Sequence, residues 1–242
     1  MVAVITGAGK GIGRAVALRL AQDGYKIAVC YKNSKSAAEN TVSDIISNGG
    51  VSKAFQLDIT DSQNVNSAIS EIEKSFGEID VLVNNAGIAE QSLFTDITDE
   101  RWQKMIDTNL SGAFYCARAV LPFMIHRKKG KIINIASIWG ETGGSCEVHY
   151  SAAKAGLIGM TKALAKEVGP SGITVNCVSP GVILTDMTAH FDADTMNELK
   201  DETPLGRIGT PEDIAGAVSF LASADADFIT GQDIAVNGGM NI

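Results

Sequence analysis

The chain has 242 residues, of which 45% are hydrophobic and 20% charged, an ordinary balance for a globular protein long enough to bury a sizeable core. Its 28 acidic residues outnumber its 20 basic residues, and the formal net charge of −8 argues against a general nucleic-acid-binding protein. The sequence contains no apolar run of the roughly 18 residues that a membrane-spanning helix requires.

The N-terminal residues run directly into a glycine-rich stretch, without the basic segment and cleavage site of a secretory signal. The four cysteines lie far apart in the sequence and form no metal-binding or redox motif. We therefore expect a cytoplasmic protein with no disulfide, no metal site, and no nucleic-acid or membrane partner.

Short runs rich in β-branched residues alternate with longer helical patterns from one end of the chain to the other. The predicted strands are Val2–Thr6, Lys26–Tyr31, Ser52–Leu57, Val81–Asn84, Lys131–Ala136, Thr174–Val178 and Ile234–Val236. The predicted helices cover residues 12–23, 36–47, 62–75, 100–126, 151–168 and 211–222. Continuous apolar strands that alternate with helices are typical of an α/β fold, a doubly wound parallel sheet with helices on both faces.

One segment interrupts this alternation. Residues 180–210 are mostly polar, lie between Pro180–Gly181 and Thr210–Pro211, and are too long for an ordinary connection. Long insertions of this kind are often lids over active sites, so we expect a substrate lid here. No repeat or flexible linker divides the chain, and we expect a single domain over residues 1–242.

The first predicted strand leads into a glycine-rich loop from Thr6 to Gly13, with a TGxxxGxG spacing at Gly7, Gly11 and Gly13. Glycines let a backbone approach a ligand closely, and the N-terminus of the following helix offers free N–H groups to an anion. The loop alone could be a turn without a ligand. Its place after the first strand of an α/β chain favours a dinucleotide.

Tyr150 and Lys154 are four residues apart in a helical pattern, so their side chains share one face of the helix. A nearby ammonium group favours the phenolate, so this spacing predicts a lowered pKa for Tyr150. Ser137 follows a predicted strand, and the ends of parallel strands meet at one edge of a sheet. The sequence therefore predicts a cleft where Ser137, Tyr150 and Lys154 meet.

These motifs, in this order, resemble the short-chain dehydrogenase/reductase family, and the resemblance covers the whole chain. It rests on the glycine loop, Asn84-Asn85-Ala86-Gly87, Ser137, Tyr150-Ser151-Ala152-Ala153-Lys154 and Pro180-Gly181. Within the family the chain is most similar to bacterial 3-oxoacyl-[acyl-carrier-protein] reductases. The resemblance implies a Rossmann-type sheet of about seven parallel strands and a homotetramer.

The resemblance also implies a nicotinamide cofactor and a set of residues that hold it. These residues are Thr6, Gly7, Gly9, Lys10, Gly11, Ile12, Gly13, Tyr31, Lys32, Asp58, Ile59, Asn85, Ala86, Gly87, Tyr150, Lys154, Pro180, Gly181, Ile183 and Thr185. Relatives that prefer NAD place an aspartate just after the second strand, where this chain has Tyr31. Because Lys10 and Lys32 could pair with a 2′-phosphate, we expect NADP(H). Asp58 alone would be a candidate cap for the predicted helix over 62–75.

By the same resemblance, four residues carry the chemistry of a ketone reduction. Ser137 hydrogen-bonds the substrate carbonyl, Tyr150 gives it a proton, Lys154 binds the ribose and tunes Tyr150, and Asn109 sustains a proton relay through a water molecule. Trp139 and Glu147 are candidate substrate contacts beside them.

Several substrates remain open. A ketone on an acidic acyl carrier protein would need a basic docking patch, to which Arg127, Lys128 and Lys129 could contribute, although Ser171 stands where such reductases often carry an arginine. The stretches around Trp139 and Glu147 resemble reductases of a 5-aminopentanone group on translation elongation factor P, and a carboxylate suits an ammonium-bearing substrate. Sugar or steroid alcohols, and a non-catalytic NADP-binding regulator, are further alternatives.

Overall fold

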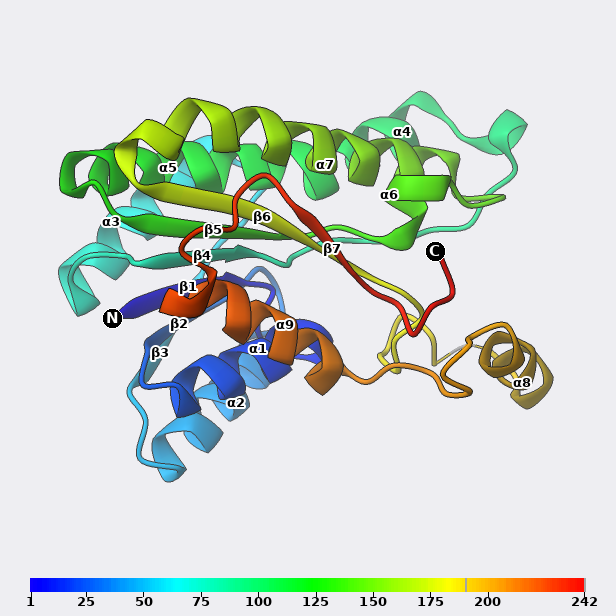
Figure 1. Cartoon of the computed structure of the whole chain (residues 1–242), viewed down its shortest axis with the longest axis horizontal. Helices are drawn as coiled ribbons and strands as arrows, with labels where there is room; N and C mark the ends of the chain where they lie inside the picture. The colour runs from blue at the N-terminus through cyan, green and yellow to red at the C-terminus, as the bar shows by residue number, and fades with distance from the viewer. Residues whose placement is uncertain (190, 242) are drawn as a thin grey trace.

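The computed structural model describes residues 1–189 and 191–241, whose strands form one parallel sheet between two layers of helices (Figure 1). The sheet has seven strands in the order β3-β2-β1-β4-β5-β6-β7. They are β1 (Val2–Thr6), β2 (Lys26–Tyr31), β3 (Ser52–Gln56), β4 (Val81–Asn84), β5 (Gly130–Ile135), β6 (Ile173–Pro180) and β7 (Asp233–Val236). The predicted fold class is confirmed, and the predicted strand ends differ from these by at most two residues.

The helices divide between the two faces of the sheet. Figure 1 shows α1, α2 and α9 on one face and α3, α4, α5 and α7 on the other. The bounds are α1 (Gly11–Gln22), α2 (Lys35–Ser47), α3 (Ser62–Phe76), α4 (Asp99–Ile106), α5 (Gly112–Arg127), α6 (Ile138–Thr142), α7 (Val148–Val168), α8 (Ala193–Asp201) and α9 (Pro211–Ala222). Among the described residues, no helix is long and apolar enough to cross a membrane.

Each face of the sheet buries its own apolar core, which explains the continuous apolar strands. In β1, Ala3 and Ile5 belong to the core beneath α1 and α9, whereas Val2 and Val4 belong to the core beneath α3 and α5. Successive side chains of a strand point to opposite faces, so a strand covered on both sides has no polar alternation.

Three helical predictions need correction. The helix expected over 100–126 is interrupted by a π-helical turn at Asp107–Ser111, and the helix expected from 151 begins at Val148. The segment 180–210, expected to be irregular, contains α8, which buries none of its residues. α8 is short and mostly polar, and Met196 and Leu199 are its few half-buried apolar residues, so the helical signal in the sequence is weak there.

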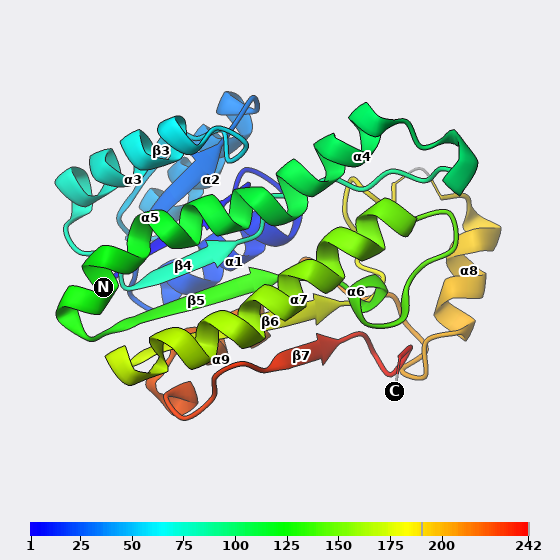
Figure 2. The same ribbon diagram turned by 90° about the horizontal axis from the view of Figure 1, so that it is seen from above.

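The order of the strands places the site. The chain runs from β1 outward to β2 and β3 and then returns to β4 on the other side of β1. Ligands of such sheets bind in the crevice at the carboxyl ends of the strands where this reversal occurs. In Figure 2 the carboxyl ends of β4, β5 and β6 point toward α6 and α8, so these helices border the same edge of the sheet.

Candidate active site

The glycine loop is tied to the end of β4 by Thr6 and Asn85. The Thr6 hydroxyl accepts hydrogen bonds from the backbone N–H groups of Asn85 and Ala86, each at 3.0 Å. The Asn85 amide donates to the backbone carbonyls of Thr6 at 2.9 Å and Gly7 at 3.2 Å. These three residues, predicted to contact a cofactor, therefore also fix the two loops that would hold it.

The N-terminus of α1 is open to an anion. Lys10 is its N-cap residue, and the Lys10 side chain accepts no hydrogen bond from the first turn of the helix. Gly7 and Gly11 have φ angles of +66° and +53°, which side chains rarely tolerate, so the loop conformation depends on glycine there. Unpaired N–H groups at a helix N-terminus beside a parallel-sheet crevice fit the pyrophosphate of a dinucleotide.

Gly13 makes this loop sensitive to a single methyl group. A Cβ atom added at Gly13 would lie 2.4 Å from the Gly7 carbonyl oxygen and 2.5 Å from the Asn85 amide nitrogen. We expect Gly13→Ala to weaken dinucleotide binding more than tenfold, measured by fluorescence titration, because backbone cannot give way. Gly216→Ala, in α9, has no atom within 4 Å of the added Cβ and is the matched control. Unchanged binding in Gly13→Ala would contradict this role of the loop.

The two cations predicted to meet a 2′-phosphate both pair with carboxylates of the chain. Lys10 Nζ lies 2.7 Å from Asp186 Oδ2, and Lys32 Nζ lies 2.8 Å from Asp58 Oδ2. All four side chains are substantially exposed, so water and salt screen these pairs and a charged ligand can compete for them.

Asp58 does not cap the following helix. The cap of α3 is Asp61, which accepts from the backbone N–H groups of Gln63 and Asn64. Asp58 instead accepts from the hydroxyl and the backbone N–H of Thr60, at 2.6 and 3.0 Å. Partial burial opposes ionisation, but hydrogen bonds from Lys32 and Thr60 lower the pKa of Asp58. Asp58 is therefore a charged group beside the glycine loop.

Lys154 is buried beneath the cleft with one backbone partner. Its Nζ donates to the Ile135 carbonyl oxygen at 2.7 Å, and burial lowers its pKa from 10.5 to about 8. Gly140 of α6 allows this close packing, since a Cβ there would lie 2.9 Å from the Lys154 carbonyl carbon. A Cβ at Gly87 would lie 3.7 Å from Nζ, so the loop after β4 borders the lysine as well.

Tyr150 lies in the first turn of α7, with Lys154 Nζ 5.6 Å from the centre of its ring. Burial raises the pKa of Tyr150 to about 12; the Ser137 hydroxyl lowers it and the charge of Glu147 raises it. The predicted lowering by Lys154 is wrong for this arrangement, because desolvation dominates and the ammonium group bonds to Ile135. The phenol therefore keeps its proton at neutral pH, the form that a proton donor needs.

Ser137 follows β5 and begins α6. Its hydroxyl accepts a hydrogen bond from the Trp139 backbone N–H at 3.2 Å, which makes it the N-cap of that short helix. The side chain is 7% exposed and acts on the pKa of Tyr150, so the two hydroxyl groups are neighbours. Two hydroxyls side by side can both hydrogen-bond one carbonyl oxygen of a bound molecule.

Asn109 lies in the π-helical turn between α4 and α5. Its side-chain amide donates to the backbone carbonyls of Ile88 at 3.0 Å and Met105 at 3.1 Å. Its oxygen accepts from the Ile88 backbone N–H at 3.1 Å, and a Cβ at Gly87 would lie only 2.6 Å from that oxygen. Asn109 therefore fastens the loop after β4 to the helix. Its part in a proton relay stays a prediction, although π turns are frequent at functional sites.

Glu147 and Trp139 border the loop that leads into α7. Glu147 is half-buried, and desolvation raises its pKa while a hydrogen bond from Gln91 opposes the rise. The half-buried Trp139 side chain lies 3.1 Å from the position of a Cβ on Gly144. The charge of Glu147 raises the pKa of Tyr150, so the carboxyl group is close enough to act electrostatically on the predicted catalytic hydroxyl.

The beginning of the segment 180–210 covers the glycine loop. Pro180 is the last residue of β6. Gly181 packs tightly against Asn237, because a Cβ atom added to Gly181 would lie 2.8 Å from the Asn237 Cα. Ile183 is buried and forms a β-bridge with Gly209. Two residues further on, Thr185 Cγ2 would lie 3.4 Å from a Cβ on Gly11. Tyr31 and Ile59, at the ends of β2 and β3, complete the same edge of the sheet, and Ile12 packs on the core beneath it.

The basic run does not border the cleft. Arg127, Lys128 and Lys129 connect α5 to the amino end of β5, whereas Ser137 follows the carboxyl end of that strand. Arg127 is 13% exposed and lies 3.2 Å from Glu78 and 3.6 Å from Asp80. The prediction that these three residues contribute to a docking patch beside the cleft of their own chain is therefore wrong.

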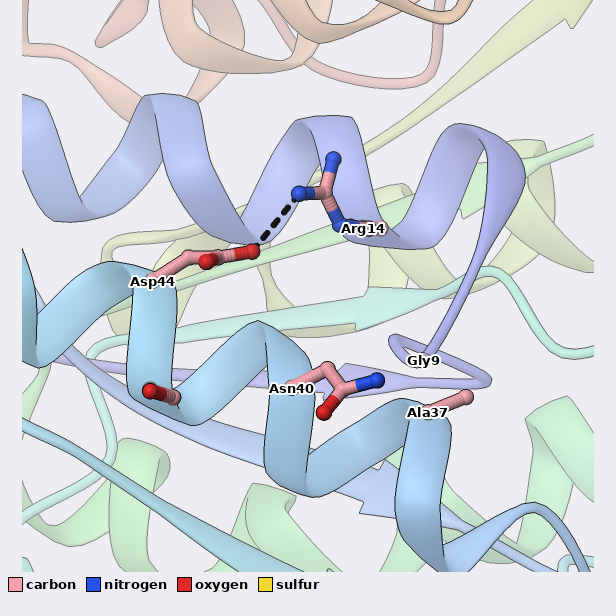
Figure 3. Close-up of a pocket in the computed structure, with 6 residues that line it drawn as sticks. Gly9, Arg14, Ala37, Asn40 and Asp44 are labelled. Carbon is pink, nitrogen blue, oxygen red and sulfur yellow. Dashed lines mark hydrogen bonds and ion pairs between the residues drawn. The ribbon is translucent and has the colours of Figure 1, made fainter.

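A shallow pocket of about 410 Å³ lies on the outer flank of the glycine loop, between α1 and α2 (Figure 3). Gly9 forms one end of it, and Arg14 lies 2.7 Å from Asp44 across it. A Cβ at Gly9 would lie 3.2 Å from the Ala38 nitrogen, so α2 packs directly on the loop. The pocket shares only Gly9 with the predicted site residues.

Three positions that sequence reasoning did not single out shape the site. The Ile135 backbone carbonyl accepts a hydrogen bond from Lys154, and the backbone of Ile88 exchanges hydrogen bonds with the Asn109 side chain. Gly140 has no side chain, which lets α6 pack closely against Lys154. Every residue has a backbone carbonyl group, so the residue type does not reveal which carbonyl accepts a hydrogen bond at the site. The glycine three residues after Ser137 is the one signal that was available.

Comparison with known proteins gives consistent matches over the full chain. The family model described as Enoyl-(Acyl carrier protein) reductase matches residues 7–241. The 3-oxoacyl-[acyl-carrier-protein] reductase of Staphylococcus epidermidis is 46% identical over 238 residues, 98% of each chain. That of Escherichia coli is 44% identical over 239 residues, 99% of this chain and 96% of the relative.

Among solved structures, a putative gluconate dehydrogenase from Agrobacterium tumefaciens superposes with a TM-score of 0.96 at 34% identity. The match covers 99% of this chain and 95% of that one.

Proposed function

The chain belongs to the short-chain dehydrogenase/reductase family, and we propose that it is an NADPH-dependent reductase of a 3-oxoacyl group on an acyl carrier protein. One observation carries the proposal: the neighbouring hydroxyls of Ser137 and a protonated Tyr150 lie above buried Lys154, at the carboxyl edge of the sheet. That edge also holds the uncapped N-terminus of α1.

In this reaction the nicotinamide supplies a hydride to the ketone carbon. The Ser137 hydroxyl hydrogen-bonds the ketone oxygen and holds it beside Tyr150. As negative charge develops on that oxygen, the Tyr150 hydroxyl gives it a proton. A phenol whose pKa is about 12 keeps its proton at neutral pH and loses it to the still more basic alkoxide that forms in the reaction.

Lys154 stabilises what Tyr150 leaves behind. Below pH 8 its buried ammonium group is charged, and with Nζ 5.6 Å from the centre of the Tyr150 ring it would attract the phenolate that forms in the reaction. A neighbouring ribose hydroxyl would be its second partner, and Asn109 would hold the path by which Tyr150 regains its proton. Thr6, Asn85 and Ala86 keep the two loops of the cofactor site in register.

The ketone is supported by the relatives' names, whereas the family description names an enoyl substrate. We expect NADPH oxidation with acetoacetyl carrier protein at least tenfold faster than with crotonyl carrier protein. Ser137 and Tyr150 meet at one oxygen, which a ketone provides at its reacting carbon. Faster reduction of the crotonyl double bond would overturn the proposed substrate class.

The cofactor preference is a separate prediction. No carboxylate occupies the position of Tyr31, and Lys10 and Lys32 lie beside the loop, so the unmodified protein should bind NADPH about tenfold or more tightly than NADH. Exchanging Tyr31 for Asp and Lys32 for Ala together should reverse this order in a fluorescence titration. Equal dissociation constants for the two nucleotides in the unmodified protein would contradict it.

A second candidate substrate is an aminoketone, such as a 5-aminopentanone group on translation elongation factor P. The observation that favours it is the half-buried Glu147 carboxyl group, whose charge reaches Tyr150. A carboxylate in that place attracts an ammonium group on the substrate and offers nothing to a neutral acyl chain.

Glu147→Gln separates the two substrates. With an aminoketone the variant should lose up to about a hundredfold in kcat/KM, because one member of a partly desolvated charge pair is gone. With a neutral 3-oxoacyl thioester it should stay within about twofold of the unmodified protein. If neither substrate responds, the aminoketone proposal fails and the carrier-protein proposal stands.

The remaining alternatives have their own tests. The structural neighbour named for gluconate prompts an assay of gluconate with NADP⁺, and steroid alcohols can be assayed in the same way. If gluconate or a steroid alcohol is turned over faster than the 3-oxoacyl substrate, the proposed substrate is wrong. Absence of turnover with every ketone, together with saturable NADPH binding, would support a non-catalytic regulator.

A further inference from the structure

The ion pair between Lys10 and Asp186 joins two parts of the chain that are 176 residues apart in sequence. Lys10 is the N-cap of α1 in the glycine loop, and Asp186 lies beyond β6 in the segment 180–210. Their charged atoms are 2.7 Å apart, and both side chains are mostly exposed. A carboxylate thus lies on the Lys10 ammonium group, beside the helix N-terminus that the cofactor phosphates would approach.

The contact belongs to a folded arm rather than to a loose side chain. Ile183 and Leu184 anchor the arm to Gly209 through a β-bridge and a backbone hydrogen bond of 2.9 Å. Thr188 then closes a turn, because its hydroxyl accepts from the Thr185 backbone N–H at 3.1 Å and donates to the Ile183 carbonyl oxygen at 3.0 Å. This turn presents Asp186 to the glycine loop.

A second contact brings the same arm onto the loop. Thr185 Cγ2 would lie 3.4 Å from a Cβ on Gly11, the first residue of α1. The arm therefore covers the amino end of α1 with a methyl group and satisfies Lys10 with a carboxylate. The first-turn N–H groups of α1 have no side-chain acceptor, so Asp186 engages the lysine and leaves the helix end available.

We propose that Asp186 is an internal competitor of the cofactor's 2′-phosphate for Lys10, and so sets the affinity and the selectivity for NADPH. The inference rests on the proposed function, which supplies the cofactor. Binding of NADPH exchanges the carboxylate for the phosphate on Lys10. Because Asp186 is fixed to the arm, the exchange also frees the tip of the arm from the glycine loop.

A phosphate would replace the carboxylate partner of Lys32 less easily. Asp58, the partner of Lys32, is held by two hydrogen bonds from Thr60 and its pKa is lowered, so it is fixed in place and charged. Asp186, by contrast, pairs with Lys10 across an exposed contact that water and salt screen. Lys10 is therefore the cation whose partner a phosphate replaces more easily.

The test is equilibrium binding of NADPH and NADH, measured by nucleotide fluorescence at low ionic strength. Asp186→Asn should tighten NADPH binding by about two- to fivefold, the range expected for one exposed ion pair. The dissociation constant of NADH should change less than that of NADPH, because NADH has no 2′-phosphate. Glu198→Gln removes an equal charge from exposed α8 in the same segment and should change neither constant.

A double-mutant cycle identifies the residue through which Asp186 acts. In a Lys10→Met background, Asp186→Asn should no longer tighten NADPH binding, because no cation remains to be released. Equal tightening with and without Lys10 would show a general charge effect and overturn the proposal, as would an unchanged NADPH constant in Asp186→Asn. Failure of the unmodified protein to bind NADPH saturably would instead overturn the proposed function.

Discussion

Replacing Tyr150 by Phe should reduce ketone turnover by roughly 10² to 10⁴, the range attributed to general acid catalysis. The variant keeps the aromatic ring in the first turn of α7 and removes only the hydroxyl group that neighbours Ser137. NADPH binding should stay within about twofold, since the glycine loop and Lys154 are unchanged. The loss should therefore appear in kcat at saturating cofactor.

The matched control for Tyr150 is Tyr25→Phe. Tyr25 is also buried, and its hydroxyl donates to the Ala222 carbonyl oxygen at 2.8 Å, far from Ser137 in the core beneath α9. That variant should lose stability and keep its turnover per folded molecule. A Tyr150→Phe protein with near-normal ketone reduction would show that another group supplies the proton.

Lys154→Met should abolish efficient turnover and weaken cofactor binding, while it makes the folded chain more stable below pH 8. Methionine fills a similar volume without a charge that burial penalises. The loss of function follows because the ammonium group would hold both the phenolate of Tyr150 and the ribose. The gain in stability follows from the pKa of Lys154, which burial lowers from 10.5 to about 8.

The sign of this stability effect depends on pH. Between pH 8 and 10.5 the unfolded chain binds a proton at Lys154 that the folded chain does not, so the stability of the unmodified protein rises with pH there. Below pH 8 the burial penalty is fully present, and a shift of this size corresponds to roughly 3 kcal/mol. In Lys154→Met the Ile135 carbonyl oxygen loses its hydrogen-bond donor. This loss offsets part of the gain in stability by an amount that does not depend on pH.

Denaturant unfolding at a series of pH values measures this difference. The advantage of Lys154→Met over the unmodified protein should shrink as the pH rises from 8 to 10.5. A constant difference across that range would show that Lys154 titrates normally in the folded chain. Lys162→Met, at an exposed position on the same helix, is the control and should show no such slope.

The sheet could be predicted from the sequence because its strands carry their own signal. β1 is buried along its whole length, so Val2 to Ile5 form an unbroken apolar run, and its place directly before the glycine loop indicates the topology. α8 could not be predicted, because it buries none of its residues. The π turn at Asn109 could not either, since its neighbours α4 and α5 form one continuous helical pattern in sequence.

The sequence indicated which residues meet at the candidate site, but it did not indicate their electrostatics. The spacing of Tyr150 and Lys154 placed both on one face of α7, but the pKa of the tyrosine depends on burial. That desolvation arises only when the folded chain packs around Tyr150, and the short sequence motif gives no information about it. The pairing of Lys10 with Asp186 joins residues 176 positions apart, and pairing between exposed charges leaves no pattern in a single sequence.

The central claim is that this chain moves a hydride from NADPH to a ketone carbon while Tyr150 supplies the proton. The most direct measurement is the mass of the alcohol formed from acetoacetyl carrier protein and NADPH that bears deuterium at both C4 positions of the nicotinamide. We expect a product with one deuterium at the former ketone carbon, and far less of it from Tyr150→Phe. An alcohol without deuterium, or an equal yield of labelled alcohol from Tyr150→Phe, would contradict the account.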